Sequence, residues 1–117
     1  MSITLEILTE TNYKTFLNAW DGTEPYSEYE GRWEEAIAVY TNFSGNTGRL
    51  YDVLYPMRDY ADDFSRETGS TVNIATKAEL GQILSKETDE ELLDKWEYVM
   101  GYLDSVPDAE TLYFFTD

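Results

Sequence analysis

The chain has 117 residues, of which 24 are acidic and 8 are basic, and its formal net charge is −16. It contains neither histidine nor cysteine, which excludes disulfides, thiolate nucleophiles, cysteine-ligated metals and histidine-based acid–base catalysis. With 42% hydrophobic and 15% aromatic residues it is nevertheless apolar enough to form a core, unlike a disordered acidic segment. We therefore expect one acidic globular domain over residues 1–117.

Charge and hydropathy also restrict where the chain resides and what it binds. No basic segment followed by an apolar run opens the sequence, and no apolar stretch approaches the roughly 20 residues that span a bilayer. A net negative charge repels anionic lipids and nucleic acid phosphates. We expect a cytoplasmic protein that binds neither membranes nor nucleic acid directly. Self-repulsion favours a monomer or a small dimer.

The first third of the chain predicts a strand and two helices. Apolar and polar residues alternate over residues 3–7, which is typical of a half-buried strand. Apolar residues then recur at helical spacing over residues 13–20, with Thr11 or Asn12 as the expected N-cap. A loop separates this helix from a second, short helix expected over residues 33–40.

The middle third predicts a broken helix and a strand. We expect residues 44–46 to end the short helix as a turn. A helical period continues over residues 50–64, but Pro56 interrupts it, and a proline inside a helix costs about 3 kcal/mol. We expect a break there, with Pro56 opening the second helical piece. Residues 70–75 are a strand candidate.

Two capping boxes mark the last third. Thr76 with Glu79 and Thr88 with Glu91 each have the spacing that caps a helix N-terminus. The second box begins the clearest amphipathic helix of the chain, which continues to residue 103.

An apolar segment over residues 112–115 predicts a last strand, and we expect it to pair with the first. Strands and helices in this order predict an α+β domain, in which a small sheet of the N- and C-terminal strands packs against several helices.

The acidic residues are concentrated in the two ends of the chain. Residues 1–39 carry a net charge of −6, residues 40–78 a net charge of −1, and residues 79–117 a net charge of −9. Pairing of the terminal strands would bring the two acidic ends together.

The densest acidic segment has a spacing that costs stability. In a helix, Glu87 and Glu91 form a like-charge pair at i, i+4, as do Glu90 and Asp94. Each such pair destabilises a helix by about 0.2–0.5 kcal/mol. Only Glu91 and Lys95 have the favourable order at the same spacing. Helix stability alone does not explain this pattern.

The spacing is compatible with binding a basic surface. Carboxylates four residues apart on a helix are about 6 Å apart along its axis, and phosphates of one DNA strand advance about 3.4 Å per nucleotide. A row of carboxylates on a helix therefore approximates a row of phosphates. The candidate partner-binding residues are Glu24, Glu28, Glu30, Glu34, Glu35, Asp59, Asp62, Asp63, Glu87, Asp89, Glu90, Glu91, Asp94, Glu97 and Asp104.

In size, charge and lack of catalytic residues the chain resembles the acidic DNA-mimic proteins, which include antirestriction proteins, anti-CRISPR proteins and a bacterial mimic that binds the histone-like protein HU. The resemblance lies in composition and carries no diagnostic motif. It implies an inhibitor that occupies the DNA-binding surface of a basic protein, such as a restriction enzyme, a CRISPR effector or a histone-like protein.

Three alternatives remain open at this stage. The first alternative is an immunity protein that neutralises a cationic nuclease toxin, and the second is an acidic adaptor subunit. The third is a protein whose charge serves only to keep it in solution. A DNA mimic should present long rows of acids, whereas an immunity protein should present a compact patch rich in aromatic residues.

Nothing in the sequence predicts an enzyme, a cofactor or a metal centre. Adjacent carboxylates such as Glu34 and Glu35 point about 100° apart on a helix and make poor catalytic pairs. The chain has no calcium-binding loop and no phosphate-binding glycine motif. Six tyrosines cannot all be buried, and we expect some to flank the acidic face: Tyr26, Tyr29, Tyr51, Tyr55, Tyr98 and Tyr102.

Overall fold

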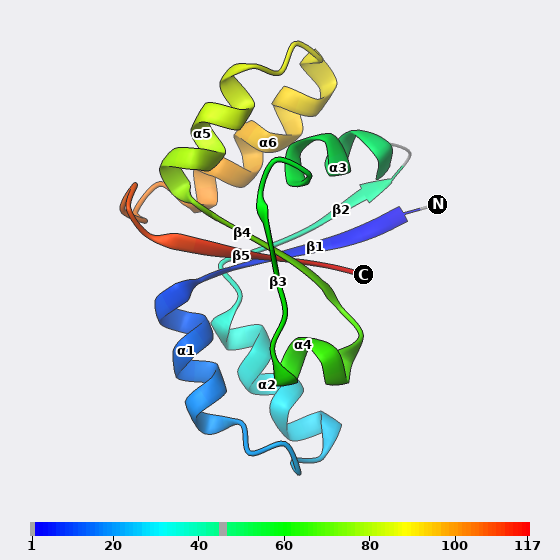
Figure 1. The fold of residues 1–117 in the computed structure, drawn as a ribbon, viewed down its shortest axis with the longest axis vertical. Coiled ribbons are helices and arrows are strands. Elements are labelled where there is room, and N and C mark those ends of the chain that lie inside the picture. The colour runs from blue at the N-terminus through cyan, green and yellow to red at the C-terminus, as the bar shows by residue number, and fades with distance from the viewer. Residues whose placement is uncertain (1, 45–46) are drawn as a thin grey trace.

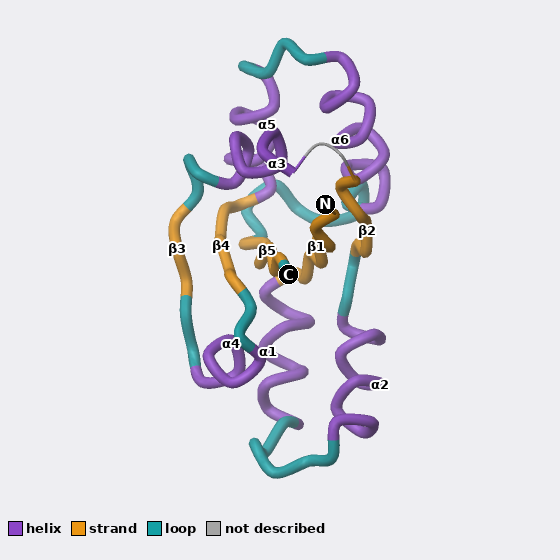
Figure 2. Tube along the Cα trace, turned by 90° about the vertical axis from the view of Figure 1, so that its right-hand side faces the viewer, coloured by secondary structure: helices purple, strands orange, loops and turns teal. Residues whose placement is uncertain are grey.

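The computed structural model describes residues 2–44 and 47–117. Its centre is a five-stranded antiparallel sheet, and helices cover both faces of that sheet (Figure 1). The predicted α+β class is confirmed. In Figure 2 the central strands β1 and β5 lie at mid-height, with α3, α5 and α6 above them and α1, α2 and α4 below them.

The strands follow the order β2-β1-β5-β4-β3 across the sheet, so β2 and β3 are its edges. The predicted pairing of the first and last strands is confirmed, since β1 and β5 are antiparallel neighbours at the centre. The strands are β1 (Ser2–Thr9), β2 (Val39–Ser44), β3 (Arg58–Tyr60), β4 (Thr71–Thr76) and β5 (Thr111–Thr116).

The helices divide into two sets of three among the described residues. In Figure 1, α1, α2 and α4 lie below the sheet, and α3, α5 and α6 lie above it. The helices are α1 (Glu10–Ala19), α2 (Tyr26–Ala36), α3 (Thr47–Leu54), α4 (Asp63–Thr68), α5 (Lys77–Ser85) and α6 (Glu90–Tyr102).

Each face of the sheet has its own apolar core, and β5 contributes to both. Leu112 and Phe114 belong to the core under α3, α5 and α6, while Tyr113 and Phe115 belong to the core under α1, α2 and α4. Successive side chains of a strand point to opposite faces, so a continuous apolar strand is the expected sequence of a strand covered on both sides. The largest buried side chain is Trp96 of α6.

The second predicted helix is wrong in its bounds. The helix α2 begins at Tyr26 and ends at Ala36, and residues 39–44 form the edge strand β2 instead. Val39 and Phe43 point into the core while Tyr40 is exposed, which is the alternation of a strand. Pairing with β1 overrides the local helical spacing. Of the predicted turn over residues 44–46, Gly45 and Asn46 lie outside the described residues.

The break at Pro56 is confirmed, but Pro56 does not open a second helix. The helix α3 ends at Leu54, the short strand β3 follows the turn, and α4 begins only at Asp63. Strand β3 forms because Arg58 and Tyr60 pair with Ile74 and Val72 of β4. A long-range backbone pairing therefore replaces the expected helical turn.

Helix caps agree with the prediction at one of three sites. The Thr76 and Glu79 capping box is present at α5. Helix α1 begins two or three residues earlier than predicted, with Thr9 as its N-cap in place of Thr11 or Asn12. At α6 the cap is Asp89, whose side chain accepts a hydrogen bond from the backbone of Leu92, and the predicted box of Thr88 and Glu91 is wrong. An aspartate cap one residue later serves the same role.

Candidate functional site

The exposed side of α6 carries a straight row of carboxylates. Glu90, Asp94 and Glu97 are all exposed, and we call them the α6 row. They are spaced by four and three residues, so they lie on one face of the helix. In the described part of the chain no ion pair reaches any of these three residues. The α6 row is therefore a strip of uncompensated negative charge.

The opposite side of α6 fixes this row in place. Leu92, Trp96 and Val99 are at most 1% exposed and pack into the core above the sheet. The helix cannot rotate without exposing these side chains, each of which contributes on the order of 2 kcal/mol by burial. The row is thus held by a rigid element.

Glu91 and Lys95 do not form the ion pair that their spacing favours. The Lys95 ammonium lies 5.6 Å from the centroid of the Phe43 ring on β2, and among the described ion pairs none joins it to Glu91. Glu91 is exposed. Tyr98 and Tyr102 follow Lys95 at i+3 and i+7, so these two exposed tyrosines lie on the flank of α6 that faces β2.

Three further candidates lie near α6. A carboxylate oxygen of Glu87 accepts hydrogen bonds from the backbone N–H groups of Thr88 and Asp89 at 2.9 and 3.0 Å, so Glu87 stabilises the loop between α5 and α6. Asp89 is the N-cap of α6. Asp104 is exposed in the turn that follows α6.

The candidates on and before α2 divide into three kinds. Glu28 and Glu35 are exposed on the outer side of the helix. Glu30 and Glu34 line a cleft, which is described below. Glu24 forms an ion pair with Arg32, and its side chain is only 10% exposed. Glu24 therefore holds the loop before α2 against the helix.

The three aspartates near β3 and α4 have local structural contacts. Asp62 caps α4 and also accepts a hydrogen bond from the hydroxyl of the buried Tyr13. Asp59 accepts a hydrogen bond of 3.2 Å from the Asn73 amide. Asp63 forms an ion pair of 3.6 Å with Arg66, and its side chain is 92% exposed.

The two acidic helices lie on opposite faces of the sheet but on one side of the molecule. In Figure 2, α6 lies above and α2 below the edge strand β2, and all three are at the right-hand side. The molecule measures 44 × 33 × 22 Å. Because α6 and α2 lie on opposite faces of the sheet, the acidic segments at the two ends of the chain do not form one continuous patch. They flank a shared sheet edge.

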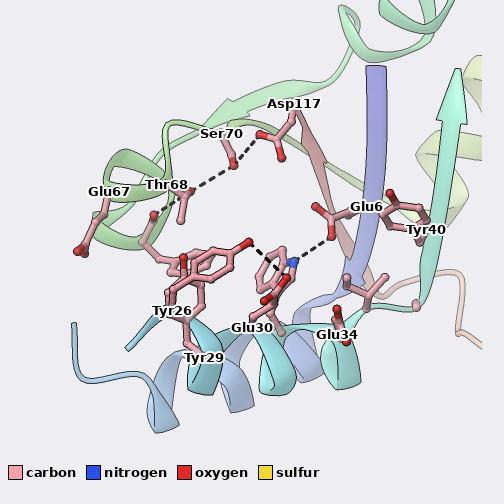
Figure 3. Close-up of a pocket in the computed structure, with 14 residues that line it drawn as sticks. Glu6, Tyr26, Tyr29, Glu30, Glu34, Tyr40, Glu67, Thr68, Ser70 and Asp117 are labelled. Atoms are coloured by element: carbon pink, nitrogen blue, oxygen red, sulfur yellow. Dashed lines mark hydrogen bonds between the residues drawn. The ribbon is translucent and has the colours of Figure 1, made fainter. Parts of the chain in front are cut away.

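A cleft of about 880 Å³ lies beside α2, and residues of α2, α4, β1 and β2 line it together with Asp117. Glu6 of β1 and Asp117 approach it from the sheet, and Glu30 from α2, while Glu67 lies at its outer end (Figure 3). None of the described residues that line the cleft is basic. The lining residues are Glu6, Tyr26, Tyr29, Glu30, Trp33, Glu34, Ile37, Ala38, Tyr40, Phe64, Glu67, Thr68, Ser70 and Asp117.

Glu6 is one of two carboxylates of this cleft, with Glu30, that are only partly exposed. Burial raises the pKa of Glu6 above its ordinary value, and the nearby charges of Asp117 and Glu34 raise it further. A hydrogen bond of 2.9 Å from the Trp33 indole N–H opposes this by stabilising the ionised form. A cation in the cleft would lower the pKa of Glu6 by offsetting both the burial and the like charges.

Aromatic packing holds the indole of Trp33 in position. Its ring centroid lies about 5 Å from those of Phe16, Phe64 and Phe115, so the indole is fixed on three sides. Along the same helix, Tyr26 packs edge-to-face on Tyr29 at 5.1 Å. The Tyr26 hydroxyl donates a hydrogen bond of 3.3 Å to Glu30 (Figure 3).

Sequence reasoning identified Glu30 and Glu34 but missed Glu6, Glu67 and Asp117. The strand alternation places Glu6 on the sheet face opposite that of Leu5. The pairing of Leu5 with Thr116 then brings Asp117 to the same region. Only the exact register of two strands distant in the chain shows this proximity, and the sequence does not encode that register locally.

Comparison with protein-family models, with curated proteins and with solved structures finds no match to this chain. None of the described helices combines the length and apolarity that a membrane crossing requires. Within residues 2–44 and 47–117, no group of three or more carboxylates is arranged to hold a metal ion.

Proposed function

We propose that this protein is a DNA-mimic inhibitor, which occupies the DNA-binding surface of a basic protein through rows of carboxylates. The observation that carries the proposal is the α6 row: Glu90, Asp94 and Glu97 are exposed, face the same way and have no ion-pair partner among the described residues. When a basic surface neutralises such a row, the counterions that gather along the row are released, as they are along a row of phosphates.

The length of the α6 row and the length of the molecule both support this proposal. At a rise of about 1.5 Å per residue, the α6 row is roughly 10 Å long, which corresponds to about three phosphates of one DNA strand. The helix α2, which carries the exposed carboxylates of Glu28 and Glu35, lies on the same side of the molecule as α6, beyond the edge strand β2 (Figure 2). The 44 Å length of the molecule is that of roughly 13 base pairs.

The supporting contacts are those of a rigid interaction surface. The row lies on a helix that is anchored by buried apolar residues, so little conformational entropy is lost when a partner binds. The exposed Tyr98 and Tyr102 next to the row offer aromatic rings joined by a hydrogen bond of 3.1 Å between their hydroxyls. Tyrosines are favoured at protein interfaces because an apolar ring carries a polar end.

A second candidate function is an immunity protein that neutralises a cationic nuclease. The cleft beside α2 favours it, because this cleft combines carboxylates and aromatic side chains in a compact area. The two functions differ in whether duplex DNA competes with this chain for the partner. Duplex DNA displaces a DNA mimic from its partner. A nuclease that is bound by a compact patch beside its active site still binds DNA.

The proposal is tested by reversing charges in the α6 row. Glu90→Lys combined with Asp94→Lys should abolish inhibition of the partner and leave the circular dichroism spectrum unchanged. A matched control is Asp21→Lys combined with Asp108→Lys, which changes the net charge equally at exposed loop positions outside the candidate set. Equal loss in both double variants would show that only net charge matters. Full activity of the Glu90 and Asp94 variant would refute the α6 row as the binding surface.

A further inference from the structure

The cleft beside α2 has the shape of a binding site for part of another molecule. Its volume of about 880 Å³ lies within the range of pockets that enclose small ligands or several side chains. One wall is α2, the opposite wall is the end of α4 with the following loop, and the floor is sheet that carries Glu6 (Figure 3). The cleft is therefore bounded by two helices of the lower layer and by the sheet.

The charge around the cleft is of one sign. Five carboxylates line it from four parts of the chain, and no described lining residue is basic. Asp117 and Glu34 both act on Glu6 through their charges. This repulsion is relieved when a cation binds between the carboxylates, so charge complementarity requires a positively charged occupant. The five carboxylates belong to Glu6, Glu30, Glu34, Glu67 and Asp117.

The aromatic lining distinguishes among cations. Tyr26, Tyr29 and Trp33 lie along one side of α2 and contribute rings to the cleft. A guanidinium group is planar, stacks on aromatic rings and donates up to five hydrogen bonds in a fixed fork, whereas an ammonium group is a compact and strongly hydrated charge. Carboxylates placed around aromatic rings therefore match arginine better than lysine.

We propose that this cleft receives an arginine side chain of the basic partner, with the guanidinium group between Glu6 and the carboxylates of α2. The inference rests on the proposed function in one respect, that the partner is a basic protein. It adds a contact separate from the α6 row, which lies on the other face of the sheet. Rows of acidic residues attract any basic surface, whereas the cleft makes binding specific for arginine.

The probe is a short peptide, acetyl-Gly-Arg-Gly-amide, titrated into the full chain at 150 mM salt and followed by nuclear magnetic resonance. The reporter is the indole N–H signal of Trp33, which is bonded to Glu6. Among the three tryptophans of the chain it is assigned by comparison with Trp33→Phe. The arginine peptide should shift this signal in a saturable way. The matching citrulline peptide, which is neutral but nearly isosteric, should leave it unchanged, and the lysine peptide should bind at least about threefold more weakly.

Two substitutions on α2 form a matched pair. Glu34→Gln removes a carboxylate from the cleft, while Glu35→Gln removes one from the outer side of the same helix. Glu34→Gln should weaken arginine binding about threefold, and Glu35→Gln should leave it within error. Glu6→Gln, which retains an oxygen for the Trp33 indole, should weaken it about tenfold.

The results test the arginine site and the DNA-mimic proposal separately. The inference is overturned if the arginine peptide does not shift the Trp33 signal, if the lysine or citrulline peptide binds equally well, or if Glu34→Gln and Glu35→Gln behave alike. The double variant of Glu90 and Asp94 should keep full arginine binding in the cleft. If that variant loses partner inhibition but keeps the peptide, both proposals stand. If it keeps both, the α6 row is not the surface that inhibits the partner, while the arginine site remains.

Discussion

The charge at position 94 should control the stability of α6 in a graded way. Asp94 lies four residues from Glu90 and three from Glu91 and Glu97, and all four side chains are exposed. A carboxylate at position 94 therefore faces three others on the helix surface. Each like-charge pair costs about 0.2–0.5 kcal/mol, so each unit of positive charge added at this position should raise the free energy of unfolding by about 0.6–1.5 kcal/mol at low ionic strength.

The series Asp94→Glu, Asp94→Gln and Asp94→Lys isolates this effect, because glutamate, glutamine and lysine have nearly equal helix propensities while their charges differ by one unit each. Stability should rise from Glu through Gln to Lys. The midpoint of thermal unfolding should rise by about 4 °C per kcal/mol for a domain of this size. Because the side chains are exposed, about 1 M salt should remove most of the difference.

Urea unfolding followed by circular dichroism, at 10 mM and at 1 M salt, measures both effects. Equal stability of the three variants at low salt would refute the idea that the α6 row is held together against electrostatic repulsion. A rise that persists unchanged at 1 M salt would show that a non-electrostatic property of the side chains is responsible. Either result would remove the main argument that this spacing serves binding and not helix stability.

Three further predictions concern the remaining carboxylates and the core. The pKa of Glu6 is raised from 4.5, so its ionised form opposes folding, and this cost appears as the pH rises above 4.5. Glu6→Gln should therefore be more stable than the natural chain at pH 7 and equal to it at pH 3.5, as measured by urea unfolding. Asp62→Ala should destabilise the protein by about 2 kcal/mol, because it removes the α4 cap and the acceptor of the Tyr13 hydroxyl. The control Asp63→Ala should change stability by less than about 0.5 kcal/mol. Equal effects of the two substitutions would show that the contacts of Asp62 do not stabilise the fold. Trp96→Ala should cost about 3–5 kcal/mol by leaving a cavity in the upper core, and a loss below about 1 kcal/mol in chemical denaturation would show that this core is loosely packed.

The sequence predicts the parts of this fold that depend on local spacing. The first strand follows from alternation, the last strand from a continuous apolar run, and the long helix before residue 103 from its helical period. The strand near residues 70–75 and the pairing of the two terminal strands are also predicted. These segments are strongly patterned because each has a fully buried side. In them the local preference and the global packing agree.

The errors occur where a distant partner determines the local structure. Residues 39–44 and 58–60 become strands because β1 and β4 offer backbone partners for them. Both segments are edge strands, which have only one neighbour and therefore a weak sequence pattern. Propensity is a weak guide in such segments because tertiary context overrides it.

The candidate site shows the same division. The α6 row follows from spacing on a single helix, and the structure places it on an exposed face as expected. In contrast, Glu24 and Asp62 are indistinguishable in sequence from surface acids, yet one forms an ion pair with Arg32 and the other caps a helix. The cleft depends on residues from both ends of the chain, so no local pattern identifies it.

Competition with duplex DNA tests the central proposal most directly. The partner is captured on the immobilised chain at low salt, purified, and titrated with the chain in the presence of a fluorescent 30-base-pair duplex. If the chain is a DNA mimic, it displaces the duplex with one-to-one stoichiometry, and the Glu90→Lys and Asp94→Lys double variant does not. A ternary complex, in which the partner holds the chain and the duplex together with undiminished affinity for each, would contradict the account.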